Sequence, residues 1–321
     1  MNKKTKKILK IVLPIALGVF LVWYLYYSTT PEQRLEILGH VKNADPFWIS
    51  ISIGIGMLSH ISRAIRWNYL LEPLGYTPKI SNNVFIILTA YLANLGIPRS
   101  GEFLRATELA TYENVPFEKG FGTIVTERIV DVIMLLLIIL VALLFQTELI
   151  LGFILESGIG LYGGLVALII GVLGLFLLIR LIKKSTSGFA IKLRGFLNNL
   201  LAGVLSIFKM KRKWSFIFHT LFIWIAYFAM FWVVKFTILE TIGLSLGELL
   251  VAFVGGAIAM TTTNGGFIAY PAFVSKSLEI FGVSIVAGNA FGWIMWIAQT
   301  LMIVVFGAIS FLILPLLNRN R

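Results

Sequence analysis

The sequence predicts an all-α polytopic membrane protein with about six full transmembrane helices plus two re-entrant helical hairpins arranged as an inverted repeat. Hydrophobic residues make up 58% of the chain and charged residues 13%, whereas an ordinary globular chain carries roughly 25% charged residues. The mean hydropathy is +0.92. Because each crossing takes about 20 apolar residues, the 321 residues leave no room for a sizeable aqueous domain. The composition therefore excludes a separate soluble catalytic domain.

The first 46 residues are expected to form an N-terminal anchor and an external loop. Five lysines lie within the first ten residues and precede an apolar stretch at 11–27. This stretch is longer than a secretory signal core and lacks an obvious small-residue cleavage site, so we expect it to be retained. The positive-inside rule places the N-terminus in the cytoplasm, together with the basic C-terminal tail at 315–321.

Charged loops assign a side of the membrane to the segments that follow. The loop at 146–157 contains acidic but no basic residues, whereas 180–213 contains nine basic residues and no acidic one. The first is therefore placed outside and the second inside. Within the second stretch, 188–209 carries an apolar helical stripe and is expected to lie as an amphipathic helix on the cytoplasmic surface. Besides the anchor and a connecting span after 157, full spans are expected at 47–62, which leads to Arg63 and Arg66 inside, and at 121–145, 214–236 and 287–314.

Two further segments must begin and end on the same side of the membrane. Given the directions of the neighbouring spans, 80–118 begins and ends inside, and 245–285 begins and ends outside. A lipid-facing helix could not hold the charges of the first return limb at about 2.5 to 3.5 kcal/mol per central charge. Both segments are therefore expected to be re-entrant hairpins, which are tolerated inside protein or along a watery cavity. The charges concerned are Arg99, Glu102, Arg105, Glu108 and Glu113 in the first limb and Lys276 and Glu279 in the second.

The two hairpins divide the chain into two similar halves. Residues 47–145 and 214–314 each contain a span, a hairpin and a span, with opposite sidedness. Paired Gly/Pro-interrupted segments in an inverted repeat mark the substrate site, and the turns here read NLGIPRSG at 94–101 and TTTNGG at 261–266. Chance similarity of the two halves is the alternative. We treat the chain as a single integral membrane domain in which 146–213 joins the halves.

Polar residues at the first turn indicate a place for a phosphate. A half-helix that begins near Ser100 would put Arg99, Glu102 and Arg105 on one face, and Gly101 would allow a tight turn. The helix N-terminus adds positive potential, and arginine supplies a planar fork for phosphate. The alternative is that Glu102 only neutralises the two arginines on a solvated loop.

A second cluster lies inside the apolar helix expected at 121–145. Counted from its start at 1.5 Å per residue, Asp131 lies roughly 15 Å deep, near the middle of the hydrocarbon core. Arg128 and Asp131 are neighbours that could pair, whereas Glu127 and Asp131 would repel unless a cation lies between them. Intramembrane ionisable residues are by default a functional hypothesis. The alternative is a purely structural buried ion pair.

The second half offers polar but uncharged candidates: Asn264, Gly265, Gly266, Tyr270 and Gln299. Substrate contact and a simple tight turn are equally good readings of the first three. The three histidines lack metal-ligand spacing, so no metal is expected. The sequence contains no nucleophile elbow, P-loop or HExxH motif, so neither a catalytic residue nor a cofactor is assigned.

The run PRSGEFLR at 98–105, followed by TERIVD at 126–131 and by NGG at 264–266, resembles the lysylphosphatidylglycerol synthase transmembrane, or flippase-like, family. The resemblance covers the chain from the second span to the last. It implies lipid translocation in a bacterial cytoplasmic membrane without the synthase domain of some members. Where many relatives have a Glu after the glycine turn and an Arg in the final span, this chain has Pro271 and Trp296, which should change headgroup preference. The positions that match the family pattern are Arg99, Gly101, Glu102, Arg105, Glu127, Arg128 and Asp131.

The expected function is that of a lipid flippase for a phospholipid or a related anionic or aminoacylated lipid. Its partners would be membrane phospholipids with anionic headgroups rather than nucleic acid, with a homo-oligomer or a lipid synthase as a further possibility. Since no ATP-binding motif is present, transport would be passive or coupled to an ion or proton gradient, with Asp131 or Glu127 as proton carrier. The alternatives are a membrane-embedded enzyme acting on lipid or polyprenyl phosphate, and an accessory subunit of a lipid synthase.

Overall fold

The computed structural model describes residues 27, 30–97, 99–147, 210–263 and 265–319. Over these residues it contains nine α-helices and no strand, in agreement with the all-α expectation. The expected anchor at 11–27 (except Tyr27), the connecting span and the amphipathic helix at 188–209 lie outside the described residues. The chain divides into two compact units, one formed by 1–124 and 214–321 and the other by 125–213, and each unit is described by itself.

The segment expected as an external loop contains a helix, α2 (Pro31–Lys42). Its start carries a complete capping box, in which the Thr30 hydroxyl accepts from the Gln33 N–H and the Gln33 side chain accepts from the Thr30 N–H. Pro31 occupies the first turn, where its missing N–H is no loss. A Thr, Pro and Gln at these positions form a helix-start signal. The helix was therefore predictable from the sequence, although only a loop was expected here.

Four helices of the described residues are long and apolar enough to cross a membrane. They are α3 (Pro46–Leu71, continued by the short helix η1, Glu72–Leu74), α6 (Phe117–Phe145), α10 (Lys213–Val234, continued by η2, Lys235–Thr237) and α13 (Ile285–Leu317). Each coincides with an expected span. The largest difference is at α3, which runs nine residues beyond the expected end at 62, so Arg63 and Arg66 lie inside the helix rather than after it.

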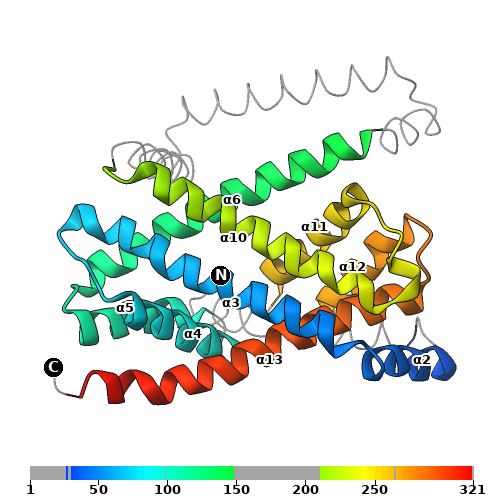
Figure 1. The fold of residues 1–321 in the computed structure, drawn as a ribbon, viewed down its shortest axis with the longest axis horizontal. Coiled ribbons are helices and arrows are strands. Elements are labelled where there is room, and N and C mark those ends of the chain that lie inside the picture. The colour runs from blue at the N-terminus through cyan, green and yellow to red at the C-terminus, as the bar shows by residue number, and fades with distance from the viewer. Residues whose placement is uncertain (1–26, 28–29, 98, 148–209, 264, 320–321) are drawn as a thin grey trace, which may run out of the picture. The chain divides into compact units, whose positions relative to one another are not determined.

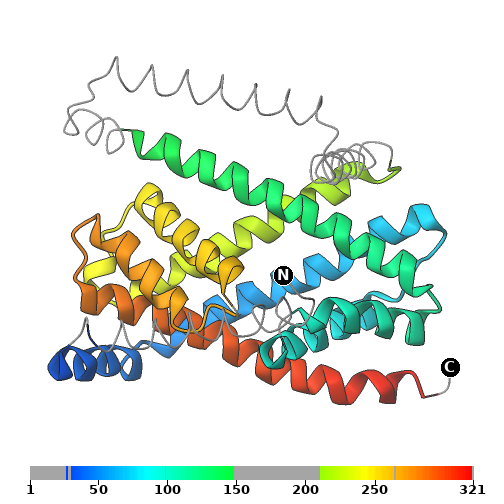
Figure 2. The same cartoon turned by 180° about the vertical axis from the view of Figure 1, so that it is seen from behind.

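Two shorter helical hairpins complete the first unit: α4 (Ile80–Gly96) with α5 (Ser100–Glu113), and α11 (Leu246–Thr262) with α12 (Ala269–Glu279). Between α10 and α11 the chain also forms the short helix η3 (Leu239–Thr241). In Figures 1 and 2, the two hairpins come from opposite ends of the unit, and their turns point toward its middle. Helix α13 packs against α12 near one end and against α4 near the other.

The two hairpins have first limbs of equal length and similar breaks. Helices α4 and α11 each have 17 residues. The second limb of each hairpin follows a non-glycine residue in the left-handed region, Arg99 with φ 61° and Ile268 with φ 64°. This conformation is uncommon for side chains larger than glycine, and most of all for a β-branched residue such as Ile268. It persists only where the surrounding packing enforces it, so both breaks are held by their environment.

Small residues bring the limbs of the hairpins close to their neighbours. A Cβ at Gly288 of α13 would lie 2.9 Å from the Cα of Ser275 in α12, and a Cβ at Gly292 would collide with Pro271. In the first hairpin, a Cβ at Gly101 would collide with the carbonyl of Ala90. Such small-residue contacts are the usual means by which membrane helices approach closely.

Candidate functional site

The turn of the first hairpin is built from hydrogen bonds that span the break. The Gly101 N–H donates to Asn94 Oδ1 at 2.7 Å, and the Ser100 hydroxyl donates to the carbonyls of Ala93 at 3.0 Å and Ile97 at 2.8 Å. Helix α5 begins at Ser100, as the sequence predicted. The side chain of Asn94 and the lack of a Cβ at Gly101 together let α5 return directly against α4.

The three charged residues expected on one face of α5 differ in their surroundings. Arg99 precedes the helix and is exposed, Glu102 is half-buried, and Arg105 is 3% exposed. The Arg105 guanidinium lies 3.8 Å from the centre of the Trp67 ring in α3. An arginine stacked on a desolvated indole gains a cation–π attraction of about 2 kcal/mol. Arg105 is therefore held in a fixed position, whereas Arg99 reaches the surface of the turn.

Trp67 is itself oriented by α6. Its indole is fully buried, and Nε1 donates to Thr123 Oγ1 at 2.8 Å. The Thr123 hydroxyl in turn donates to the Gly120 carbonyl at 2.7 Å. These contacts link α5, α3 and the first turns of α6 through Arg105, Trp67 and Thr123.

Two buried arginines on α3 were not among the predicted site residues. Arg63 is 2% exposed and Arg66 is 0% exposed. Arg63 Nη2 donates to the Tyr227 hydroxyl at 3.1 Å, and Arg66 Nη1 donates to Thr220 Oγ1 at 3.3 Å, both on α10. Both arginines had been interpreted as markers of the cytoplasmic side. The signal that could have found them is the helical period, which puts Arg63 and Arg66 on the same face as the buried residues Gly56, Ser59, His60, Trp67 and Leu70.

The second cluster belongs to the unit formed by 125–213. Arg128 Nη1 lies 3.7 Å from Asp131 Oδ2, which confirms the expected i, i+3 pair. The Arg128 side chain is 43% exposed and that of Asp131 12%, while Glu127 is 0% exposed. Because α6 begins at Phe117 rather than at 121, Asp131 lies 14 residues, or about 21 Å, from its start. Glu127 is the more buried carboxylate of the two, because its exposed fraction is 0% and that of the Asp131 side chain is 12%.

At the second hairpin, the structure brings together most of the expected uncharged candidates. Gly265 and Gly266 both have positive φ, at 70° and 68°, and Asn264 lies outside the described residues. The Gly265 carbonyl accepts a hydrogen bond of 2.9 Å from Trp296 Nε1 in α13, and the buried Tyr270 hydroxyl interacts with Gln299. Trp296 therefore fastens the turn to α13. In the sequence, Trp296 differed from the family pattern, and this contact was not predicted.

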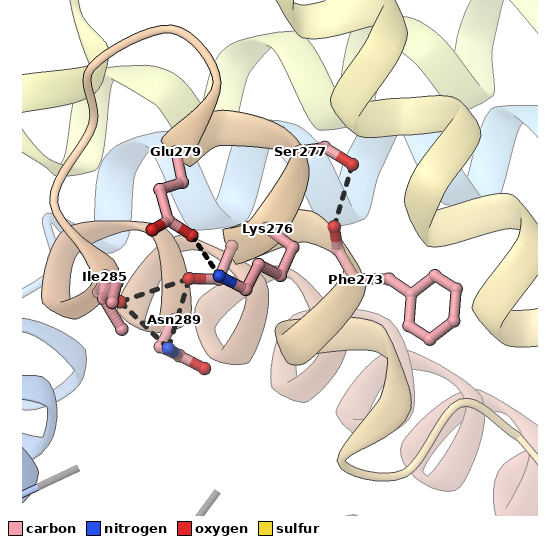
Figure 3. Close-up of polar contacts among 7 residues, drawn as sticks. Phe273, Lys276, Ser277, Glu279, Ile285 and Asn289 are labelled. Carbon is pink, nitrogen blue, oxygen red and sulfur yellow. Dashed lines mark hydrogen bonds and ion pairs between the residues drawn. The ribbon is translucent and has the colours of Figure 1, made fainter. Parts of the chain in front are cut away.

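The charges on the return limb of the second hairpin are exposed. Lys276 Nζ pairs with Glu279 Oε2 at 2.7 Å, and their side chains are 64% and 39% exposed (Figure 3). Nearby, Asn289 of α13 donates to Ser275 Oγ at 3.2 Å and to the Ile285 carbonyl at 2.9 Å (Figure 3). The hydrogen bond from Asn289 to Ser275 joins α12 to the first turns of α13.

The part of the chain that the structure describes contains no group of three or more His, Asp or Glu side chains placed to hold a metal ion. The arrangement is instead one of buried guanidinium groups beside hydroxyl and aromatic side chains. Such groups suit phosphate, which arginine binds through its planar fork.

Comparison with known proteins identifies a matching family. A family model described as "Lysylphosphatidylglycerol synthase TM region" matches residues 11–317. The chain is 30% identical over 104 residues to the glycosyltransferase AglD of Haloferax volcanii, which covers 32% of this chain and 16% of that protein. It is 26% identical over 99 residues to the UPF0104 membrane protein MJ1595 of Methanocaldococcus jannaschii, covering 30% of each chain.

A UPF0104 membrane protein of Methanothermobacter thermautotrophicus is 28% identical over 115 residues, covering 35% of this chain and 33% of that protein. The chain thus matches about a third or less of the length of these curated relatives. No solved structure matches it.

Proposed function

This chain belongs to the lysylphosphatidylglycerol synthase TM region family, and on that premise we propose that it moves a phospholipid, or a related anionic or aminoacylated lipid, between the leaflets of a membrane. The observation that carries the proposal is the pair of hairpins, α4–α5 and α11–α12, whose turns point toward each other from opposite ends of the first unit (Figures 1 and 2). Interrupted helices in this arrangement are typical of transporter binding sites.

The proposed architecture is an inverted repeat of α3 to α6 and α10 to α13, with both hairpins re-entrant. Three observations support it. The helices follow one another in the same order in both halves, α4 and α11 are equally long, and each second limb follows a residue in the left-handed region. We place both termini in the cytoplasm and count about six full spans, of which two come from segments outside the described residues. The membrane is proposed to be the bacterial cytoplasmic membrane, with anionic phospholipids as partners.

In this mechanism the headgroup passes through the protein while the acyl chains stay in the bilayer. Arg105, held by Trp67, supplies a fixed positive charge next to the first turn, and Arg99 supplies an exposed one. The sequence contains no P-loop, so transport is passive or driven by a gradient. We propose Glu127 or Asp131 as the proton carrier, because ionisable residues inside a membrane are by default a functional hypothesis.

The test is leaflet exchange of fluorescent phosphatidylglycerol by the full-length protein in proteoliposomes, with protein-free vesicles as the control. We expect exchange well above that of the control. Either Asp131→Asn or Glu127→Gln should remove any dependence of exchange on a pH gradient and so identify the proton carrier, whereas Glu279→Gln, which changes an exposed carboxylate, should leave it. If wild-type vesicles exchange lipid no faster than empty ones in the presence or absence of a gradient, the transport proposal fails.

A second candidate function rests on the stretch shared with a protein named glycosyltransferase. In that reading the chain is a membrane-embedded enzyme, or part of one, that acts on lipid or polyprenyl phosphate. The same vesicles separate the two functions. Mass spectrometry of the extracted lipids should show no new lipid species if the protein is a transporter, whereas lipid turnover without leaflet exchange would favour the enzyme.

A further inference from the structure

We propose that Phe267, Trp293 and Trp296, at the turn of the second hairpin, form an aromatic site for the ammonium group of a lipid headgroup. This inference rests on the proposed lipid transport and deepens it, because it narrows the substrate to lipids whose headgroup carries an ammonium as well as a phosphate. Phe267 and Trp293 were not among the predicted site residues.

The three rings lie close together and are steeply inclined to one another. Their centres are 6.1 Å apart for Phe267 and Trp293, 5.3 Å for Phe267 and Trp296, and 5.8 Å for the two tryptophans, with angles of 77°, 55° and 84° between the ring planes in the same order. Rings inclined in this way can face a common point, as the walls of an aromatic cage do, whereas stacked rings cannot. For three perpendicular rings at such separations, that point lies about 4 Å from each ring centre, within the ~6 Å at which a ring face attracts a cation.

The chain holds these rings in place and leaves them accessible. Trp293 and Trp296 lie about one turn apart on α13, and Trp296 is fixed by its hydrogen bond to the turn. Phe267 lies between Gly266 and Ile268, which both have positive φ, and strain of the kind that Ile268 carries is typical of ligand clamps. Phe267 is nevertheless 53% exposed, and both tryptophans are half-buried. The strained turn thus presents an aromatic ring at the surface rather than burying it.

The polar groups of the same turn present acceptors rather than donors. The hydroxyl groups of Thr261 and Thr262 donate to the Ile258 carbonyl at 2.9 Å and 2.8 Å, and that of Thr263 donates to the Ala259 carbonyl at 2.6 Å. The indole N–H at the turn is likewise engaged. The hydroxyl oxygens therefore keep only lone pairs for a further partner. Ring faces and oxygen lone pairs attract a cation and not an anion.

The turn of the first hairpin has the opposite electrostatic character. Arg99 and Ile268 occupy equivalent places, since each is the left-handed residue before the second limb of its hairpin. The first turn presents the exposed Arg99, whereas the second presents aromatic rings, and residues 249–275 and α13 contain no charged side chain. A headgroup with both a phosphate and an ammonium matches this pair of turns, because phosphate pairs with arginine and ammonium with aromatic rings.

The experiment measures binding by the full-length protein in detergent at constant ionic strength, with thermal unfolding as the readout. Short-chain phosphatidylethanolamine is compared with phosphatidylglycerol of the same chain length, which lacks the ammonium. Choline is compared with neohexanol, an uncharged alcohol of the same shape. We expect the ammonium compound of the lipid pair, or of both pairs, to raise the unfolding temperature more than its partner does.

The two pairs distinguish the source of the ammonium. A difference in the lipid pair alone assigns it to a lipid headgroup, and a difference in both pairs assigns a site that also accepts the free cation. A difference in the choline pair alone overturns the assignment to a lipid. Equal responses within both pairs overturn the proposal without any variant.

Variants then locate the site. Phe267→Leu and Trp293→Leu each remove a ring but keep an apolar side chain, and each should weaken ammonium-dependent stabilisation about tenfold in apparent Kd, whereas Phe267→Tyr should retain it. The matched control is Phe273→Leu, which removes a ring of the same hairpin that is 39% exposed and lies outside the cluster. If the folded Leu variants bind ammonium as the wild type does, the rings only pack the turn and the assignment is wrong.

Leaflet exchange separates this site from the transport function. If the wild type binds ammonium but exchanges no lipid in vesicles, the transport function fails while the aromatic site stands. If it exchanges lipid but shows no difference within either ligand pair, the aromatic site fails while the transport function stands.

Discussion

The close approach of α5 to α4 at Gly101 offers the sharpest test of the first hairpin. A Cβ at this position would collide with the carbonyl oxygen of Ala90 and would lie 2.8 Å from Asn94 Cγ. The Ala90 oxygen is backbone and cannot move to another rotamer, so Gly101→Ala must push the two limbs apart. The substitution should therefore destabilise the turn that α5 needs.

The magnitude follows from three contributions. Overpacking costs about 1 to 3 kcal/mol, and stretching the 2.7 Å bond from the Gly101 N–H to Asn94 costs about 1 kcal/mol more. Replacing glycine by alanine within a helix returns up to about 1 kcal/mol. The net loss is about 1 to 3 kcal/mol, and at about 2 °C per kcal/mol for a large domain the unfolding temperature should fall by about 2 to 6 °C.

The measurement is thermal unfolding of purified wild type and variant in the same detergent, together with leaflet exchange in vesicles. Gly96→Ala is the matched control, because this glycine ends α4 in the same hairpin and a Cβ there would meet nothing within 4 Å. It should unfold at or slightly above the wild-type temperature. An unfolding temperature for Gly101→Ala equal to that of Gly96→Ala would refute the close packing of the two limbs.

Three further substitutions test single contacts. Thr123→Val leaves the buried Trp67 N–H without its acceptor and should lower stability by about 1 to 3 kcal/mol, measured by thermal unfolding; an unchanged value would mean that the bond is not formed. Trp296→Phe keeps an aromatic ring but removes the donor to the Gly265 carbonyl, so a cysteine introduced at the second turn should react faster with a thiol reagent than in the parent, and equal rates would contradict the contact. Glu240→Gln weakens the hydrogen bonds that this side chain accepts from Ser284 at the start of α13. The free energy of unfolding should fall by about 1 kcal/mol, and this difference between parent and variant should be smaller when both are measured in high salt.

The helix positions were largely predictable because hydropathy and breaker residues act along the chain. The expected spans at 121–145, 214–236 and 287–314 differ from α6, α10 and α13 by at most four residues at either end. The turn predicted at 94–101 contains the observed break between Gly96 and Ser100. Helix α2 was not predicted, although the residues that form its capping box are a recognised helix-start signal in the sequence.

The candidate site was only partly predictable, because burial depends on which face of a helix meets a neighbour. Arg99 and Arg105 are both arginines and lie six positions apart, yet Arg99 is exposed and Arg105 is buried against the ring of Trp67. Lys276 and Glu279 were expected as charges on the return limb of the second hairpin, and only the structure shows that they form an exposed pair. Arg63 and Arg66 were interpreted by the rule for loops, which does not apply inside a helix that continues to Leu71.

The sequence by itself determined that this chain is helical and membrane-embedded, where its long helices lie, and where its two hairpins break. The length of a hydrophobic run and the backbone conformations that proline and glycine allow act locally, so their effects can be predicted from the sequence alone. Only the tertiary structure decided that Gly101 approaches Ala90, that Trp296 binds the second turn, and that Arg105 of α5 lies over the ring of Trp67 in α3. These contacts join residues from 11 to more than 30 positions apart, and their formation depends on the packing of whole helices rather than on any local preference.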